Sequence, residues 1–213
     1  WESDNWQLST FPSTVCSGAR MALSDEGDFF VISNPKANDY SGTLGVYKRT
    51  ASSTWELVDS HWGGAYREQL GSSVSLSDDG KILAVGYDAY EGFGGTGNVK
   101  IYDWDGSNYQ LRNTISGEYA NDRFGYSSAL SSDGSILAVA APANDINGDT
   151  AGQIKVMSWD GSSWTQVGED IYGETSERVG TSLSLSSNGT VLAFGTVTGS
   201  ARVYEWKNNN WTQ

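Results

Sequence analysis

Residues 130–139 read LSSDGSILAV, and the chain contains this stretch in four related forms. The other three are LSDEGDFFVI at 23–32, LSDDGKILAV at 76–85 and LSSNGTVLAF at 185–194. The glycines of the four stretches are 53, 54 and 55 residues apart. A motif that returns at a nearly constant spacing of this length indicates a protein built from tandem structural repeats.

Each repeat has the pattern of four short β-strands. An Asp-Gly or Asn-Gly pair supplies the positive φ angles of a two-residue hairpin turn, and a nearly continuous apolar run such as 136–139 follows it. The next segment, 154–159, alternates side chains with a period of two, which is typical of a β-strand. After the turn at Asp160-Gly161, an aromatic residue, Trp164, opens the last strand.

The apolar second strand of each repeat needs cover on both of its faces. Neighbouring sheets placed side by side around an axis provide that cover, whereas one repeat alone does not. The sequence therefore predicts an all-β fold, a β-propeller of four-stranded antiparallel blades with about four repeats of about 54 residues. A β-solenoid is the weaker alternative, because its repeats are usually shorter.

The repeat landmarks also divide the chain. We assign residues 1–17 to the end of a preceding blade and the four repeats to 18–69, 70–123, 124–178 and 179–213, of which the last is incomplete. The segments 1–6 and 206–211 share the form Trp-x4-Trp, so both mark the same hairpin. We favour a slice of a longer propeller, because the duplicated hairpin is surplus in a closed ring. In the alternative, residues near Gln7 supply the outer strand of the last blade and close a four-bladed ring.

The composition excludes several classes of protein. A chain of 213 residues with 38% hydrophobic residues is not disordered by composition, and no stretch approaches the roughly 20 apolar residues of a membrane-spanning helix. The formal net charge of −13 argues against a nucleic-acid partner, because phosphate binding needs clustered Lys and Arg. The single cysteine, Cys16, permits no internal disulfide; we favour a buried free thiol, with a bond to another part of a longer chain as the alternative.

A resemblance to a known family rests mainly on the third repeat. Phe124-Gly125, followed by Ala140-Ala141-Pro142, resembles the Phe-Gly and Gly-Ala-Pro repeat of the N-terminal β-propellers of integrin α chains. The other repeats carry degenerate forms, such as Leu70-Gly71 and Val179-Gly180. The resemblance covers nearly the whole chain. The calcium loop that some integrin-type repeats carry between their first two strands is replaced here by a tight turn, so that site is not carried over.

The sequence offers no recognisable catalytic set, and we expect no enzyme activity. His61 is the only histidine, so neither a Ser-His-Asp arrangement nor a histidine-based metal site is predicted. Carboxylates are plentiful, but no pair is singled out for glycoside hydrolysis. Glu68, Asp122 and Glu177 recur in register before the glycine of each repeat, which favours a structural role as acceptors for backbone or arginine donors.

One loop offers oxygen atoms at alternate positions. Asp145, Asn147 and Asp149 resemble part of a calcium-binding loop, although no bidentate glutamate follows them. We keep them as a candidate calcium site, beside the alternative that the Asn-Gly pair simply makes a turn. No other metal and no cofactor is predicted.

Two Asn-x-Thr sequences, at Asn188 and Asn210, are candidate N-glycosylation sites of a secreted protein. They occur at turns that emerge on the same side of a propeller. If both are used, that side is covered by sugar and the opposite side is the one free to bind a partner.

The opposite side carries the longer loops 34–43, 87–97 and 141–152, which differ between repeats while the strands stay alike. Variable loops on a rigid scaffold are frequent recognition sites. The alternative is that these loops are solvated connections without a partner. The contact candidates in the second loop are Tyr87, Asp88, Tyr90, Glu91 and Phe93.

These observations predict a non-enzymatic extracellular propeller, secreted or at the cell surface. It is expected to mediate protein–protein or protein–glycan contacts in adhesion or in a cell-surface or filamentous assembly. Expected partners are other proteins, glycans or further copies of the chain itself, with no nucleic acid among them. The alternative function is that of a carbohydrate-binding lectin or a glycoside-active enzyme.

Overall fold

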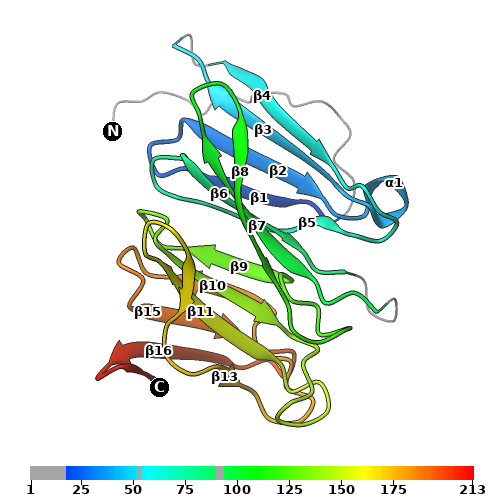
Figure 1. Cartoon of the computed structure of the whole chain (residues 1–213), viewed down its shortest axis with the longest axis vertical. Coiled ribbons are helices and arrows are strands. Elements are labelled where there is room, and N and C mark those ends of the chain that lie inside the picture. Colours follow the sequence, from blue (N-terminus) through cyan, green and yellow to red (C-terminus); the bar gives the residue numbers. More distant parts are fainter. Residues whose placement is uncertain (1–17, 52–53, 90–93) are drawn as a thin grey trace.

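The computed structural model describes residues 18–51, 54–89 and 94–213, which form four antiparallel β-sheets (Figure 1). Within each sheet, the first four strands are hydrogen-bonded neighbours in chain order, and the third sheet has a fifth, short strand that pairs with its third strand. This confirms the predicted all-β fold with four-stranded antiparallel sheets. The segment 1–17, predicted to end a preceding blade, lies outside the described residues, and Cys16 lies in it.

The strands have the following bounds. The first sheet contains β1 (Arg20–Leu23), β2 (Phe29–Asn34), β3 (Thr43–Arg49) and β4 (Trp55–Trp62). The second contains β5 (Leu70–Leu76), β6 (Ile82–Tyr87), β7 (Asn98–Trp104) and β8 (Tyr109–Ser116). The third contains β9 (Ser127–Leu130), β10 (Ile136–Ala141), β11 (Gln153–Trp159), β12 (Trp164–Gln166) and β13 (Ile171–Tyr172). The fourth contains β14 (Ser182–Leu185), β15 (Val191–Gly195), β16 (Ala201–Lys207) and β17 (Asn210–Thr212). A short helix, α1 (Ala37–Tyr40), lies between β2 and β3.

The outer strand of the third sheet is interrupted, which differs from the single fourth strand that the sequence pattern predicts. Its two pieces, β12 and β13, pair with opposite ends of β11. Between them lies Gly168 at a φ of 77°. A Cβ atom at Gly168 would stand 2.5 Å from Cζ3 of Trp206 in the next sheet. The close approach of the fourth sheet therefore requires glycine and accounts for the break in the strand.

The recurring Leu-Ser-x-x-Gly motif builds the turn between the first and second strands of every sheet. In the third sheet, the Oγ atom of Ser131 accepts a hydrogen bond of 2.9 Å from the Ile136 N–H, and the Ser131 N–H donates to the Ile136 carbonyl at 2.9 Å. Gly134 closes the turn at a φ of 68°. The same pair of bonds joins Ser24 to Phe29, Ser77 to Ile82 and Ser186 to Val191.

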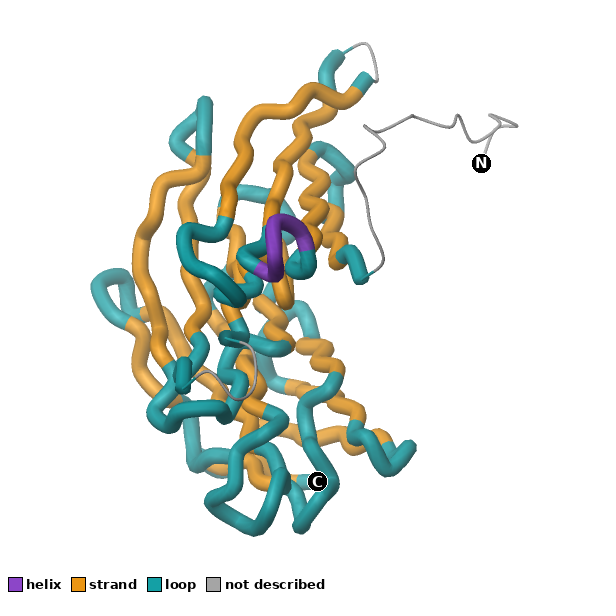
Figure 2. The backbone as a smooth tube through the Cα atoms, turned by 90° about the vertical axis from the view of Figure 1, so that its right-hand side faces the viewer, coloured by secondary structure: helices purple, strands orange, loops and turns teal. Residues whose placement is uncertain are grey.

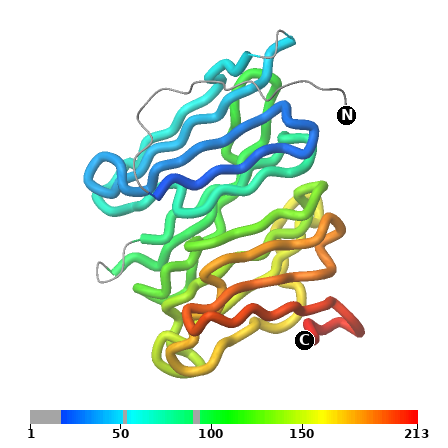
Figure 3. Tube along the Cα trace, turned by 180° about the vertical axis from the view of Figure 1, so that it is seen from behind, coloured from blue at the N-terminus to red at the C-terminus, as the bar shows by residue number. Residues whose placement is uncertain are grey.

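These turns also connect each sheet to the next. The Asp25 N–H donates to the Asp78 carbonyl at 3.0 Å, the Asp78 N–H to the Ser132 carbonyl at 2.8 Å, and the Ser132 N–H to the Ser187 carbonyl at 2.9 Å. The first strands β1, β5, β9 and β14 consequently lie side by side along the molecule, as Figure 3 shows from blue through green to orange.

The sheets follow one another along the molecule (Figure 2). The hydrophobic core lies between successive sheets rather than within one layer. We call the side of a sheet that is turned to the next sheet its forward face, and the opposite side its rear face. Forward residues Phe29 and Val46 of the first sheet share a buried cluster with rear residues Leu83 and Tyr102 of the second. The next two interfaces repeat this arrangement, with Ala84 and Ile101 beside Leu137 and Val139, and with Ala138 and Val156 beside Leu192 and Phe194.

Candidate functional site

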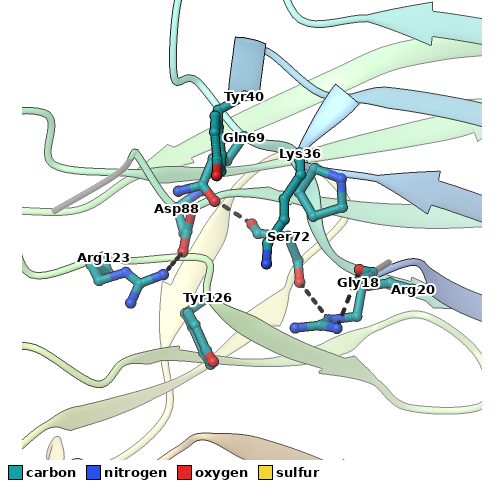
Figure 4. Close-up of a pocket in the computed structure, with 10 residues that line it drawn as sticks. Gly18, Arg20, Lys36, Tyr40, Gln69, Ser72, Asp88, Arg123 and Tyr126 are labelled. Atoms are coloured by element: carbon teal, nitrogen blue, oxygen red, sulfur yellow. Dashed lines mark hydrogen bonds and ion pairs between the residues drawn. The ribbon is translucent and has the colours of Figure 1, made fainter. Parts of the chain in front are cut away.

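A pocket of about 340 Å³ lies where the first three sheets meet (Figure 4). It is at the end of the sheets that carries the connections between second and third strands, opposite the Leu-Ser-x-x-Gly turns. The first sheet contributes Arg20 and Lys36, the second Ser72 and Asp88, and the segment before β9 contributes Arg123.

The floor of the pocket is fixed by Ser72, which bonds to residues of all three sheets. Its Oγ atom donates to the Gly125 carbonyl at 3.1 Å and accepts from the Asp88 N–H at 3.1 Å. The Ser72 carbonyl accepts from Nε of Arg20 at 3.2 Å. These bonds hold the surrounding backbone in one arrangement, so the pocket is largely formed before any ligand arrives.

Asp88 forms the acidic part of the pocket. Its side chain is 1% exposed, and its Oδ2 atom accepts a hydrogen bond of 2.6 Å from Nη2 of Arg123. Burial raises the pKa of the Asp88 carboxyl above its ordinary value, and the Arg123 guanidinium opposes that rise. The guanidinium also lies 4.6 Å from the ring centre of Tyr126, so the aromatic face holds it from the other side.

Two further cations border the pocket without a carboxylate partner. Arg20 and Lys36 are exposed, and neither forms an ion pair with any residue that the structure describes. Three cationic side chains therefore surround one carboxylate at this site. In a chain with a formal net charge of −13, this is a local excess of positive charge.

Three buried polar atoms at the pocket lack hydrogen-bond partners within the described part of the chain. They are Nε2 of Gln69, Oδ1 of Asp88 and Nε of Arg123. Buried polar atoms in folded proteins are nearly always paired, and an unpaired one calls for an explanation such as a ligand or a bound water. Two of the three are donors, and all three are themselves buried.

Three of the four charged residues of the pocket, Arg20, Lys36 and Asp88, depart from the repeat, whereas Arg123 recurs as Arg178. The strand registers align Arg20 with Ser73, Ser127 and Ser182 of the other sheets. Counted from the second strands in the same way, Lys36 aligns with Ala89, Ala143 and Thr198, and Asp88 with Pro35, Pro142 and Val197. Residues that break a structural repeat at one place are not required by its architecture, so another role is indicated for them.

The structure places the predicted contact candidates in different surroundings. Asp88 lies in the pocket. Tyr87 is 3% exposed at the end of β6, and its hydroxyl lies 3.2 Å from that of Tyr102, so its ring is not presented on the surface. Tyr90, Glu91 and Phe93 lie outside the described residues.

The side chains of the candidate calcium loop form hydrogen bonds with different parts of the chain. Oδ1 of Asp145 accepts from the Thr150 N–H at 2.7 Å, whereas Nδ2 of Asn147 donates to the Gly173 carbonyl at 2.8 Å. Across residues 18–51, 54–89 and 94–213, no three His, Cys, Asp or Glu side chains gather as a metal site. The calcium site at Asp145, Asn147 and Asp149, which includes an amide beside its two carboxylates, stays a prediction.

The two candidate glycosylation residues are exposed at the end opposite the pocket, Asn188 in a turn and Asn210 at the start of β17. Oδ1 of Asn188 accepts from the Thr190 N–H at 3.1 Å, and Oδ1 of Asn210 accepts from the Trp211 N–H at 2.9 Å. These bonds use the side-chain oxygen and orient the Nδ2 atom, which is the atom that receives a glycan.

The recurring acids bind backbone donors and cations at the connections between sheets. Oε2 of Glu68 accepts from the Gly64 N–H at 2.8 Å, and Oε2 of Glu177 accepts from the Glu174 N–H at 2.8 Å. Glu177 also pairs with Arg202. Asp122 accepts from Nδ2 of Asn144. These contacts agree with the structural role inferred from their register.

No protein-family model matches this sequence, and no curated protein is similar to it in sequence. The part of the chain that the structure describes contains no helix with the length and apolar character needed to span a membrane.

Proposed function

We propose that this protein is a non-enzymatic recognition module whose sheets are blades of a β-propeller, and that its pocket binds the carboxylate group of an acidic ligand. The observation that carries this proposal is the gathering of Arg20, Lys36 and Arg123 in one pocket of a strongly acidic chain. Hydrogen bonds between charged groups are about twice as strong as those between neutral groups. A pocket bordered by cationic donors therefore favours a carboxylate ligand.

The propeller arrangement is supported by the way the sheets associate. The first strands stand next to one another, and each interior sheet is covered on both faces by its neighbours. Propeller blades are related in this way around their central axis. We propose that the row of blades is a slice of a longer propeller of the integrin α type, with Phe124-Gly125 as the best preserved copy of the repeat motif.

The proposed biological setting is extracellular. An acidic chain with two exposed Asn-x-Thr sites at one end, and a charged pocket at the other, suits a protein that is covered by glycans on one side and binds on the opposite side. The carboxylate can belong to an acidic sugar or to an acidic protein segment in an adhesive or filamentous assembly. Among the residues that line the pocket, Asp88 is the one carboxylate, whereas glycoside hydrolysis generally uses two.

The test is calorimetric titration of the protein with an oligogalacturonide and with a hexaglutamate peptide. A neutral oligosaccharide of equal length serves as the uncharged control. We expect at least one of the acidic probes to bind, with an affinity that falls as salt is added, because an exposed charge contact is screened. The two arms show whether the carboxylate is recognised on a sugar or on a peptide.

Variants locate the binding. Lys36→Gln and Arg20→Gln are each expected to weaken binding about tenfold, which corresponds to about 1.4 kcal/mol. Asp88→Asn is expected to strengthen it, because the nearest repelling carboxylate is removed. Lys207→Gln is the matched control, since Lys207 pairs with Glu205 in the fourth sheet. Absence of binding by both acidic probes, or equal loss in the control, would contradict the proposal.

A further inference from the structure

Lys36 and Tyr40 reach the pocket from a segment whose backbone is strained. Figure 4 shows both side chains among those that line the pocket, and both residues belong to the connection between β2 and β3. In this connection, Asn38, Asp39 and Tyr40 follow one another at φ angles of 49°, 54° and 65°. We call residues 38–40 the left-handed turn.

Three such residues in succession are costly for the backbone. In the left-handed region, the Cβ atom of an L-residue lies too close to the following carbonyl oxygen, and even Asn and Asp adopt it mostly as single residues. Elsewhere in the described part of the chain, a run of adjacent non-glycine residues with positive φ is no longer than two, at Asn208 and Asn209. Strained backbone of this kind persists only where the surrounding structure holds it, and it occurs frequently in ligand-binding sites.

The second sheet holds the left-handed turn in place. The Tyr40 carbonyl accepts a hydrogen bond of 2.9 Å from the Gln69 N–H, and the Ser41 carbonyl accepts one of 3.0 Å from the Leu70 N–H. A Cβ atom at Gly42 would stand 2.3 Å from the Leu70 carbonyl oxygen, so the end of the turn packs tightly against β5. The turn therefore cannot unwind without losing contacts to the second sheet.

The beginning of the same segment is fixed by the first sheet. The Lys36 N–H donates to Oδ1 of Asn34 at 3.1 Å, and Asn34 is 5% exposed. The Gly42 N–H donates to the Ala37 carbonyl at 3.1 Å and closes the segment on itself. Both ends of residues 36–42 are therefore held, which restricts the positions that the Lys36 side chain can reach.

The strain accompanies the cation and is not a property of the repeat. Lys36 aligns with Ala143 of the third sheet. In the connection between β10 and β11, positive φ angles occur at Gly148, Thr150 and Gly152, no two of which are adjacent. A connection at this place in the repeat therefore folds without consecutive left-handed residues.

We propose that the left-handed turn is a positioning element that holds Lys36 and Tyr40 at the pocket for the carboxylate ligand. This inference rests on the proposed function, since it concerns how that site is organised. Fixing a binding side chain before the ligand arrives lowers the entropy cost of binding, so the strained turn increases affinity at the expense of stability. Asn38 and Asp39 act on the ligand only through Lys36 and Tyr40.

The test compares Asp39→Gly with Asp39→Asn. Both variants lose the same carboxylate, but asparagine tolerates the left-handed conformation, whereas glycine leaves the backbone free. In titrations with the oligogalacturonide and the hexaglutamate peptide, we expect Asp39→Gly to bind about three- to tenfold more weakly than Asp39→Asn. Asp39→Gly should melt at the same temperature as Asp39→Asn or higher, and its Gly42 amide should exchange faster.

A second substitution shows whether the loss of affinity acts through Lys36. Lys36→Gln should weaken binding about tenfold in the Asp39→Asn background but only about threefold or less in the Asp39→Gly background, because a lysine that is no longer held contributes less. Asn209→Gly is the control, since Asn209 lies in the exposed turn between β16 and β17 at a φ of 60°. It frees a backbone of the same kind and should leave the affinity unchanged.

The outcomes separate this inference from the proposed function. Equal affinities of Asp39→Gly and Asp39→Asn overturn the inference and leave the proposed function intact. An equal effect of Lys36→Gln in both backgrounds also overturns it, since the loss of affinity then has another cause. A native chain that binds neither acidic probe overturns the proposed function and this inference together.

Discussion

Asp133 stabilises the turn between β9 and β10 through one carboxylate oxygen. Oδ1 accepts hydrogen bonds from Oγ of Ser131 at 2.7 Å, from the Ser135 N–H at 2.9 Å and from Oγ of Ser135 at 2.7 Å. The bonds from Ser135 lower the pKa of the Asp133 carboxyl below its ordinary value. The group therefore contributes stability above its ordinary pKa, and this contribution is lost as pH falls through the lowered pKa.

Asp133→Asn tests this residue. The fourth sheet carries Asn188 at the aligned place, where its Oδ1 accepts equivalent bonds. We therefore expect a small loss of melting temperature near neutral pH and a shallower fall of melting temperature between about pH 5 and about pH 2. The measurement is thermal unfolding followed by circular dichroism. Asp78→Asn, at an exposed residue of the equivalent turn in the second sheet, is the control for the loss of one carboxylate. Equal profiles for Asp133→Asn and the native chain would refute the assignment.

The residues of the pocket show what a single sequence can and cannot reveal. Asp88 was identified as a contact candidate because it begins a loop that varies between repeats, and it lies in the pocket. Arg20 and Lys36 were missed, because each stands at the edge of a strand or turn whose pattern looks structural. Comparing each position across the four repeats would have found both, since the other repeats carry small or apolar residues or a threonine there. What the sequence does not contain is the distance between residues of different sheets.

The turn glycines provide a prediction about how one sheet packs on another. Gly80 and Gly27 have φ angles of 66° and 69°, so an alanine at either site is strained by a similar amount, about 1 kcal/mol. Only at Gly80 does the added Cβ also meet the Phe29 ring. Overpacking of this kind costs about 1–3 kcal/mol. Gly80→Ala should therefore lower the free energy of unfolding by about 1–3 kcal/mol more than Gly27→Ala does.

Urea unfolding of the two variants measures that difference, and each serves as the control for the other. Equal losses for both variants would show that strain in the turn dominates and that the Phe29 contact is not tight.

At the scale of strands, local patterns predicted most of what the structure shows. The second strands were identified because four apolar residues in succession follow a turn, and β6, β10 and β15 occupy those places. The break between β12 and β13 was not predicted, because its cause is the approach of Trp206 to Gly168 from another sheet. Local propensity carries no information about such a distant contact. The short helix α1 within the first long connection was also not predicted.

At the scale of the whole molecule, stability is distributed along the row of sheets. Within residues 18–51, 54–89 and 94–213, the main contacts between strands of different sheets join sheets that are neighbours in the chain, so an end sheet shares one such interface and an interior sheet shares two. In such arrays, stability is approximately a sum of units and nearest-neighbour interfaces. Local opening of an end sheet breaks one interface, whereas opening of an interior sheet breaks two.

Amide hydrogen exchange should therefore differ between sheets that have the same sequence pattern. Amides of β6 and β10 are expected to exchange about tenfold or more slowly than those of β2 and β15, because a difference of about 1.4 kcal/mol in opening free energy changes the rate tenfold. Mass spectrometry of peptic fragments resolves these strands. Uniform exchange in all four sheets at low concentration would mean that the row unfolds as one cooperative unit, and that the interfaces between sheets are stronger than the sheets themselves.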